Sequence, residues 1–224
     1  MSGGRRRLVL ASGNRHKVGE LARMVAGAGV PLEVRAAGEF GVVPEVVEDA
    51  DTFVGNALLK ARGFAGWLAG LGVPGDTLVV ADDSGLCVDV LEGGPGVWSA
   101  RFAGPGAGDA RNNARLVAEL EARGLTASLA HYVCVLVVAR VDGAPVSAGS
   151  GAAELAFEGR MDGEVRTSAR GSGGFGYDPH FWIDGGARTV AELSADAKGE
   201  RSHRGAATRA LLAALPGILA GGAG

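Results

Sequence analysis

Residues 77–86 read TLVVADDSGL. The first half is short and nearly continuously apolar, which is typical of a strand covered on both faces in an α/β sheet. Two carboxylates, Asp82 and Asp83, follow directly, and buried charge is costly unless it is paired. Ligands bind at the carboxyl ends of strands in open α/β sheets. We therefore expect at least one of the two aspartates to have a functional role.

The two aspartates cannot serve one ligand equally if the strand continues through them. Successive side chains of a strand point to opposite faces. One carboxylate should be structural, for example by bonding backbone N–H groups, and the other should reach the ligand. Carboxylate oxygens suit Mg²⁺, which would also lower the cost of the buried charge.

Strands alternate with helices upstream of this stretch. RRLVLA at 6–11 and LEVRA at 32–36 are predicted strands. The helix between them has one apolar face, formed by Val18, Leu21, Ala22 and Val25. A second helix should be capped by Asp51, with Asn56 and Lys60 together on one stripe. Its core face should carry Phe53, Ala57, Ala61, Phe64 and Leu68.

Strands cluster downstream. Asp109 should cap a helix that carries Leu116, Val117 and Leu120 inward and ends at Gly124. A strong strand signal follows at 132–141, and two further strands are expected around 146–167. The last helix should begin at Ser202, run to Leu215 and be stopped by Pro216. We predict an α/β fold around a mixed central sheet flanked by helices, in a single domain over residues 1–224.

Composition excludes several classes of protein. The chain has 224 residues, 47% hydrophobic and 21% charged, with a net charge of −3, so no nucleic-acid or anionic-membrane surface is expected. The longest apolar run, 133–139, is too short for a membrane helix. The three arginines near the N-terminus precede an apolar stretch too short for a signal peptide. Cys87 and Cys134 are interpreted as buried thiols of a reducing compartment, and the protein as cytoplasmic.

The turn SGNRHK, residues 12–17, joins the first strand to the first helix. Free N–H groups at a helix start favour an anion, Gly13 permits close approach and Lys17 adds positive charge. Phosphate binding is one reading, and an ordinary turn with solvated Arg15 and Lys17 is the other. The spacing of a P-loop is missing.

The stretch GSGGFG, residues 171–176, matches the letters of a dinucleotide-binding fingerprint. Pro179 follows closely and disfavours a helix, so the strand–turn–helix context is absent and we reject that reading. A glycine-rich loop presenting Phe175 and Tyr177 is suited to holding a flat ring. Local packing of the two aromatic side chains is the alternative.

Three cationic or donor residues gather before and within the last predicted helix: Lys198, His203 and Arg204. They could bind an anion near a helix start, or they could be solvated surface residues. The histidines and cysteines are too scattered for a zinc site. No GxSxG motif makes Ser84 a hydrolase nucleophile.

Five blocks along the chain resemble the inosine triphosphate pyrophosphatase family, which hydrolyses non-standard purine nucleoside triphosphates. They are LVLASGNRHKVGEL, VEDADTFVGNALLKAR, VVADDSGLCVDVLEGGPGVWSARFAG, GGFGYDPHF and TVAELSADAKGERSHRGAA. The blocks extend from residue 8 to residue 207. The resemblance implies two lobes with an active-site cleft between them, Mg²⁺ as cofactor and a homodimer.

The resemblance also implies roles for individual residues. Asp83 corresponds to the catalytic, Mg²⁺-binding proton acceptor, and Glu48 to an acidic residue that assists the metal, with Glu45 close enough to compete. The substrate-binding residues would be Ser12, Gly13, Asn14, Arg15, His16, Lys17, Ser84, Phe175, Gly176, Tyr177, Asp178, Lys198, His203 and Arg204. One position departs from the family, because Gly55 stands where a glutamate usually precedes the asparagine.

The implied reaction is attack by water at the α-phosphorus of ITP, dITP or XTP, giving a monophosphate and pyrophosphate. Donors facing the 6-oxygen of the base, with His203 and Arg204 as candidates, would disfavour an adenine amino group. Two alternatives are a hydrolase of modified pyrimidine nucleotides and a nucleotide-binding regulator without activity. The FGYDP and SHRG blocks speak against the first, and Asp83 with the lysines against the second.

Overall fold

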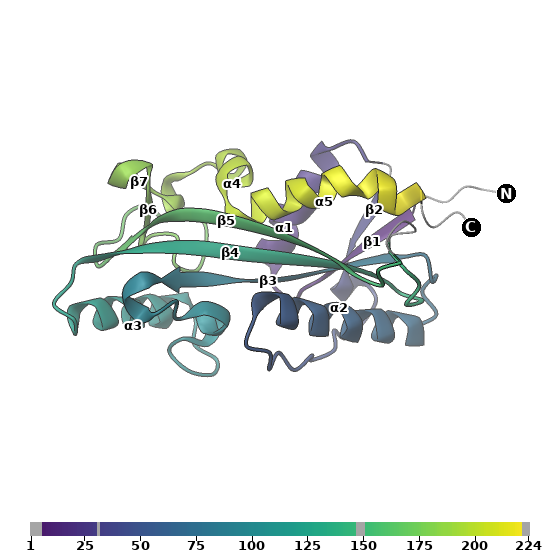
Figure 1. The fold of residues 1–224 in the computed structure, drawn as a ribbon, viewed down its shortest axis with the longest axis horizontal. Coiled ribbons are helices and arrows are strands. Elements are labelled where there is room, and N and C mark those ends of the chain that lie inside the picture. Colours follow the sequence, from purple (N-terminus) through teal and green to yellow (C-terminus); the bar gives the residue numbers. More distant parts are fainter. Residues whose placement is uncertain (1–5, 31, 147–150, 221–224) are drawn as a thin grey trace. The chain divides into compact units, whose positions relative to one another are not determined.

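Seven strands form one sheet in the order β2-β1-β3-β4-β5-β6-β7 in the computed structural model, which describes residues 6–30, 32–146 and 151–220 (Figure 1). The strands are β1 (Arg6–Ala11), β2 (Leu32–Ala36), β3 (Leu78–Val88), β4 (Ala127–Arg140), β5 (Leu155–Arg166), β6 (Phe181–Ile183) and β7 (Arg188–Thr189). The helices are α1 (Arg15–Gly27), α2 (Phe53–Gly70), α3 (Asp109–Glu121), α4 (Ala195–Arg201) and α5 (His203–Ala220).

The sheet is mixed, as predicted. β1 pairs in parallel with both β2 and β3, because α1 and α2 supply the crossovers that parallel strands need. β5, β6 and β7 pair antiparallel. The register places Ala11 opposite Ala81. The turn after β1 and the aspartates after Ala81 therefore begin at the same level of the sheet.

The described chain forms two compact units. The first extends to Asp83 and also contains Val135–Glu158 and the chain from Ala207 onward, whereas the second contains Ser84–Cys134 and Gly159–Ala206. In the first unit, α2 and α5 lie on opposite sides of the sheet, and in the second unit α3 and α4 do so (Figure 1). The single domain with a cleft between two lobes stays a prediction.

Each unit has its own hydrophobic core. In the first unit, buried side chains come from β1, β3, α2 and α5, and include Leu8, Leu10, Leu68, Val79, Leu211 and Leu215. In the second unit they come from β3, β4, β5, β6 and α3, and include Leu86, Leu116, Leu120, Tyr132, Val165 and Phe181. The apolar faces predicted for α2 and α3 are buried, apart from the half-buried Phe53 and Val117. Cys87 and Cys134 are buried and are not joined in a disulfide, as predicted.

Several predicted element boundaries are wrong. β3 continues through the aspartates to Val88, which is the case in which their side chains alternate. Among the described residues of 146–167, one strand, β5, stands where two were expected. Thr52, not Asp51, caps α2, because its hydroxyl accepts a hydrogen bond from Gly55 N. Asp109 is the first residue of α3 rather than its cap.

The predicted C-terminal helix is right at its start, where Ser202 Oγ accepts from Gly205 N, and wrong at its end. Ser202 separates α4 from α5, and α5 continues past Pro216 to Ala220. A proline lacks the N–H that would bond the carbonyl four residues earlier. Burial of Leu215 and Ile218 on either side of Pro216 keeps the helix in place despite the missing bond. None of the helices in the described ranges is both long enough and apolar enough to cross a membrane.

Candidate functional site

The acidic pair is buried in the first unit, where β3 continues through both aspartates. Asp82 is 5% exposed and Asp83 is 7% exposed. The Asp82 carboxylate forms an ion pair with Lys17 Nζ at 2.5 Å, and the Asp82 carbonyl accepts a hydrogen bond from Lys60 Nζ at 3.0 Å. Asp82 therefore holds two lysines in place, one through its side chain and one through its backbone.

Asp83 differs from Asp82 in its hydrogen bonding and in its pKa. Its Oδ2 atom is buried and has no hydrogen-bond partner among the described residues. Burial raises the pKa of Asp83 above its ordinary value. The ammonium groups of Lys60 and Lys17 oppose this rise in pKa. The Glu48 and Asp82 carboxylates add to it. Asp83 thus offers an open acceptor next to two cations.

The donor chemistry at Asp83 fits Mg²⁺. This ion is commonly bound by one or two carboxylates together with substrate phosphates and water. Within the described residues, no cluster of three or more histidine, cysteine or acidic side chains could hold a metal ion by itself. A magnesium ion here would therefore need oxygen atoms from phosphate or water in addition to the protein.

Lys60 is a residue that the sequence analysis did not include among the site residues. Its Nζ forms an ion pair with Glu48 at 2.9 Å in addition to the bond to Asp82. Asn56, one turn earlier on α2, is buried and accepts from Ala50 N at 3.0 Å, which holds the segment that carries Glu48. The four-residue spacing of Asn56 and Lys60 was the available signal. Of the two glutamates considered, Glu48 lies beside Lys60.

The SGNRHK turn is built around Asn14. The Asn14 side chain caps α1 by accepting from the backbone N atoms of His16 and Lys17, at 3.0 and 3.3 Å, and Asn14 N donates to Ser12 Oγ. The expectation that these helix N–H groups are free is therefore wrong in this structure. No described atom lies within 4 Å of a Cβ built on Gly13, so the space beside it is open. The side chain of Arg15 lies outside the described part of the chain.

Gly55, the departure from the family pattern, is closely packed. A Cβ at this position would lie 2.6 Å from Ala50 Cβ and 2.9 Å from Thr52 Oγ1. Both distances are shorter than normal contacts, so a larger side chain requires the cap of α2 to move. The local structure of this chain therefore favours glycine.

The three cationic or donor residues near the C-terminus belong to the second unit and are buried. Lys198 is 6% exposed, His203 is buried, and Arg204 is 2% exposed. The surface reading of these residues is therefore wrong. Arg204 donates to Ser84 Oγ at 2.9 Å, which brings two predicted substrate-binding residues together.

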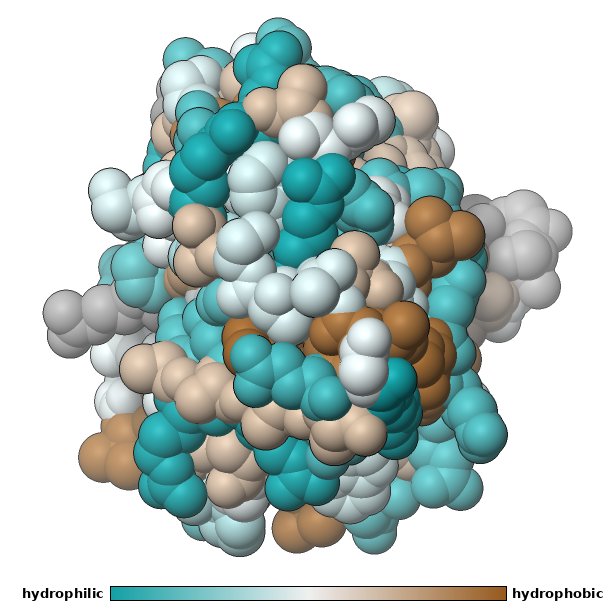
Figure 2. All heavy atoms as spheres, turned by 90° about the vertical axis from the view of Figure 1, so that its left-hand side faces the viewer, coloured by the Kyte–Doolittle hydropathy of each residue, from teal (hydrophilic) through white to brown (hydrophobic). Residues whose placement is uncertain are grey.

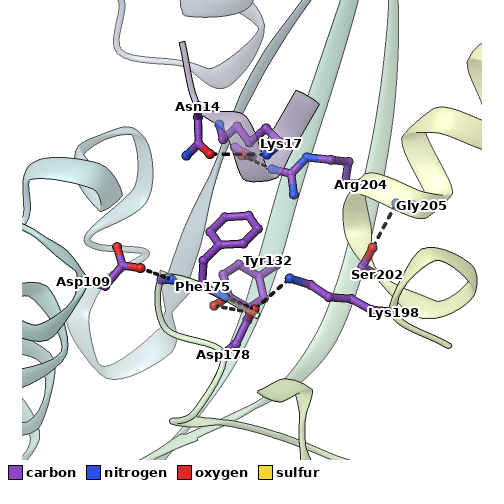
Figure 3. Close-up of polar contacts among 12 residues, drawn as sticks. Asn14, Lys17, Asp109, Tyr132, Phe175, Asp178, Lys198, Ser202, Arg204 and Gly205 are labelled. Carbon is purple, nitrogen blue, oxygen red and sulfur yellow. Dashed lines mark hydrogen bonds and ion pairs between the residues drawn. The ribbon is translucent and has the colours of Figure 1, made fainter. Parts of the chain in front are cut away.

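Asp178 organises the loop that carries Phe175 (Figure 3). Its carboxylate accepts from Phe175 N at 2.9 Å, Lys198 Nζ at 2.8 Å and Tyr132 Oη at 3.5 Å. Lys198 Nζ lies 4.3 Å from the centre of the Phe175 ring, and the Arg204 guanidinium lies 5.6 Å from it. The half-buried Phe175 ring is thus presented against two cations.

Tyr132 is a second residue that the sequence analysis missed, because it reads as an ordinary strand residue. Its ring stacks on that of His203, with centroids 4.6 Å apart and planes inclined by 11°. Burial, with a smaller effect of the Asp178 carboxylate, raises the pKa of Tyr132 well above its usual value. The hydroxyl therefore stays protonated and donates to Asp178, while the ring contacts His203.

Tyr177 is not a ring that the loop presents to a ligand, contrary to the expectation from the sequence. It is buried in the core of the second unit, and its hydroxyl donates to the carbonyl of Ser99 at 2.8 Å. Burial raises its pKa above the ordinary value. Phe175 remains as the ring that the loop can offer to a ligand.

Two cavities of the second unit lie apart from these groups. One of about 450 Å³ is lined by residues of β5, β6 and the following turn, and one of about 340 Å³ by residues around Leu91 and α3. Neither is lined by a predicted site residue. Figure 2 shows one face of this unit, which is mostly hydrophilic with separate hydrophobic patches. The candidate functional residues therefore fall into two groups, one in each unit.

Comparison with known proteins gives consistent matches. The Ham1 family model matches residues 8–214. A dITP/XTP pyrophosphatase of Chromobacterium violaceum is 47% identical and covers 94% of this chain and 98% of its own length, and one of Streptomyces coelicolor is 41% identical with 95% and 98% coverage. The solved structure of a HAM1 protein from Coxiella burnetii has a TM-score of 0.79 at 34% identity, covering 94% of this chain and 98% of that one.

A second solved structure, a nucleoside-triphosphatase and dITP/XTP pyrophosphatase from Mycobacterium abscessus, has a TM-score of 0.64 at 37% identity. It covers 94% of this chain and 98% of its own. These matches agree with the resemblance carried by the five sequence blocks and with the mixed α/β sheet. The chain belongs to the Ham1 family.

Proposed function

We propose that this protein is a Mg²⁺-dependent nucleoside triphosphate pyrophosphatase. It hydrolyses ITP, dITP and XTP to the monophosphate and pyrophosphate, and so removes them from the nucleotide pool. The similarity to curated dITP/XTP pyrophosphatases over nearly the whole chain supports this substrate class. The observation that carries the chemistry is the buried Asp83 carboxylate, whose Oδ2 is open while lysines lie nearby.

The residues of the first unit would bind the triphosphate. Lys17 and Lys60 are held by Asp82 and supply positive charge to the phosphate oxygens. Asp83, assisted by Glu48, would hold Mg²⁺, which when bound neutralises phosphate charge as a Lewis acid. Phosphoryl transfer depends mainly on such neutralisation and on alignment. Ser12, Gly13 and Asn14 line the turn beside these groups and would contact the same phosphates.

Asp83 would also direct the water. The water oxygen attacks the α-phosphorus, the bond from that phosphorus to the bridging oxygen breaks, and pyrophosphate leaves. The proton of the attacking water passes to the Asp83 carboxylate, whose Oδ2 has no hydrogen-bond partner among the described residues.

The residues of the second unit would bind the base. The Phe175 ring offers a face for stacking, with Lys198 and Arg204 against it, and His203 stacks on Tyr132. Lys198, His203 and Arg204 are the candidate donors to the base. A donor aimed at the 6-oxygen of hypoxanthine or xanthine would meet the amino group of adenine instead. Each lost hydrogen bond costs about 1–3 kcal/mol, or roughly tenfold to a hundredfold in rate.

The first experiment measures products rather than phosphate release alone. The purified protein is incubated with Mg²⁺ and ITP, dITP, XTP, ATP, GTP or modified pyrimidine triphosphates in ¹⁸O-labelled water. We expect pyrophosphate from ITP, dITP and XTP, with the label in the monophosphate. Orthophosphate release, label in pyrophosphate, or equal rates on ATP and ITP would contradict the proposal. Binding of XTP without turnover would instead support a regulator.

The proposal includes two further properties. The family resemblance implies a homodimer, and buried cysteines without a disulfide suit the reducing cytoplasm. Light scattering after size-exclusion chromatography tests the first property, and a mass of one chain would contradict it. Cell fractionation tests the second.

A further inference from the structure

The first two turns of α3 hold the loop that carries Phe175. Asp109 and Asn113 are four residues apart, so their side chains lie on the same face of the helix. Asp109 Oδ2 accepts a hydrogen bond from Gly176 N at 2.6 Å (Figure 3). Asn113 Nδ2 donates to the Gly176 carbonyl at 3.0 Å. Both polar groups of one residue are therefore bound by one helix.

Gly176 directly follows the ring that faces Lys198 and Arg204. Its φ of +63° lies in the left-handed region, which suits glycine. Phe175 N is bound by Asp178, while the next residue is bound by α3. The backbone on each side of the Phe175 side chain is thus fixed by a different partner.

The helix that supplies these contacts is itself well anchored. Leu116 and Leu120 are fully buried in the core of the second unit. Asn112, also buried, accepts from Ala103 N and donates to the Ala100 carbonyl. The contacts of Asp109 and Asn113 therefore attach the loop to a helix that is fixed in the core.

The Asn113 contact is not explained by stability alone. Its Oδ1 atom is buried and has no hydrogen-bond partner among the described residues. An unpaired buried acceptor opposes the stabilisation that the bond from Nδ2 provides. The net contribution of Asn113 to folding should be small, whereas its effect on the loop is direct.

We infer that Asp109 and Asn113 are positioning residues that hold the Gly176 peptide groups and thereby fix the Phe175 ring for the base of the nucleotide. The inference rests on the proposed function for the identity of the ligand. Neither residue takes part in the chemical step. Losing either contact should therefore weaken nucleotide binding more than turnover.

The test measures kcat and KM for dITP in four variants together with thermal unfolding. For Asp109→Ala and Asn113→Ala we expect KM to rise about fivefold while kcat stays within about twofold, the size expected for one hydrogen bond. Asp109→Asn removes the charge at the helix start but keeps an acceptor oxygen for Gly176 N. Because this hydrogen bond is kept, its KM should lie within about twofold of the wild-type value. Glu119→Ala removes a hydrogen-bonded carboxylate further along α3 and should leave KM unchanged.

Several results would overturn the inference. They are an unchanged KM in both alanine variants, an equal rise in Asp109→Asn and Asp109→Ala, or the same rise in Glu119→Ala. Hydrogen exchange of the peptide containing residues 171–178 is an independent measurement. Loss of the hydrogen bond from Gly176 N to Asp109 should speed exchange at Gly176 in Asp109→Ala and not in Asp109→Asn. If the wild-type protein hydrolyses neither dITP nor XTP, the proposed function fails, while the exchange measurement still decides the role of α3.

Discussion

Asp83 in the first unit and Asp178 in the second are both buried aspartates near lysines, yet they are used in opposite ways. Asp178 accepts hydrogen bonds from a backbone N–H, a lysine and a tyrosine. Asp83 keeps one oxygen without a hydrogen-bond partner in the described chain, and its neighbour Asp82 takes the ion pair with Lys17 instead. A satisfied carboxylate fixes a shape, whereas an open one is available to a ligand or a proton.

The largest expected effect tests whether Asp83 carries the chemistry. Asp83→Asn should lower kcat by about a thousandfold, because general-base catalysis is worth roughly 10²–10⁴. Binding of a nucleotide should largely survive, since the lysines stay in place. Steady-state kinetics with XTP and a separate binding titration measure the two quantities. An active Asp83→Asn protein would show that the wrong carboxylate has been chosen.

The next effect concerns the satisfied carboxylate. Asp178→Ala should lower the free energy of unfolding by about 3–5 kcal/mol, because it leaves the buried Lys198 without its carboxylate. Asp82→Ala should cost less, since the Lys17 side chain is more exposed than that of Lys198. Denaturant unfolding of both variants measures the difference. Equal losses would mean that the two ion pairs are not distinguished by burial.

A smaller effect is expected at Gly55, which lies in the first turn of α2, the helix that carries Lys60. Gly55→Glu should destabilise the protein by about 1–3 kcal/mol, because the new Cβ overlaps Ala50 and the Thr52 cap. Gly66→Glu in the same helix is the control, since no described atom lies within 4 Å of its Cβ position. A gain in stability for Gly55→Glu would show that the start of α2 adjusts readily.

The smallest effect reports the cost of the open carboxylate. A raised pKa in the folded protein means that protonated Asp83 favours folding, and that this contribution is lost as the pH rises through the folded-state pKa. Without metal, Asp83→Asn should therefore be more stable than the wild type above this pKa, by about 1 kcal/mol or 2–4 °C. The difference should disappear at acid pH. A constant difference at all pH values would exclude titration of Asp83 as its cause.

The order of the elements in the first unit and the motif residues could be predicted because they depend on local patterns. Apolar alternation and helix spacing identified β1, β2, α1 and α2, and glycine-rich turns identified the loops. The motifs also pointed to Asp83, Lys17 and Arg204. The alternative prediction, that Lys198, His203 and Arg204 are solvated surface residues, was wrong. Burial of these side chains depends on tertiary packing, which local sequence does not show.

Other features depend on distant partners and leave little trace in the sequence. Lys60 joins the site through Asp82 and Glu48, and Tyr132 joins it through His203 and Asp178. Asp109 has the sequence of a helix cap, yet its carboxylate binds Gly176, 67 residues away. The continuation of α5 beyond Pro216 likewise follows from burial on both sides of the proline.

The Asn14 cap should weaken the binding of simple anions at the start of α1. Its side chain already occupies the N–H groups of His16 and Lys17, so an incoming anion must offer more than one weak contact to replace it. Chloride or inorganic phosphate gains little by such an exchange, whereas a triphosphate gains Lys17 and the metal as well. We expect hydrogen exchange at His16 to respond to XTP with Mg²⁺ but not to phosphate. The ligand-free protein would then select polyphosphates over simple anions independently of any contact with the base.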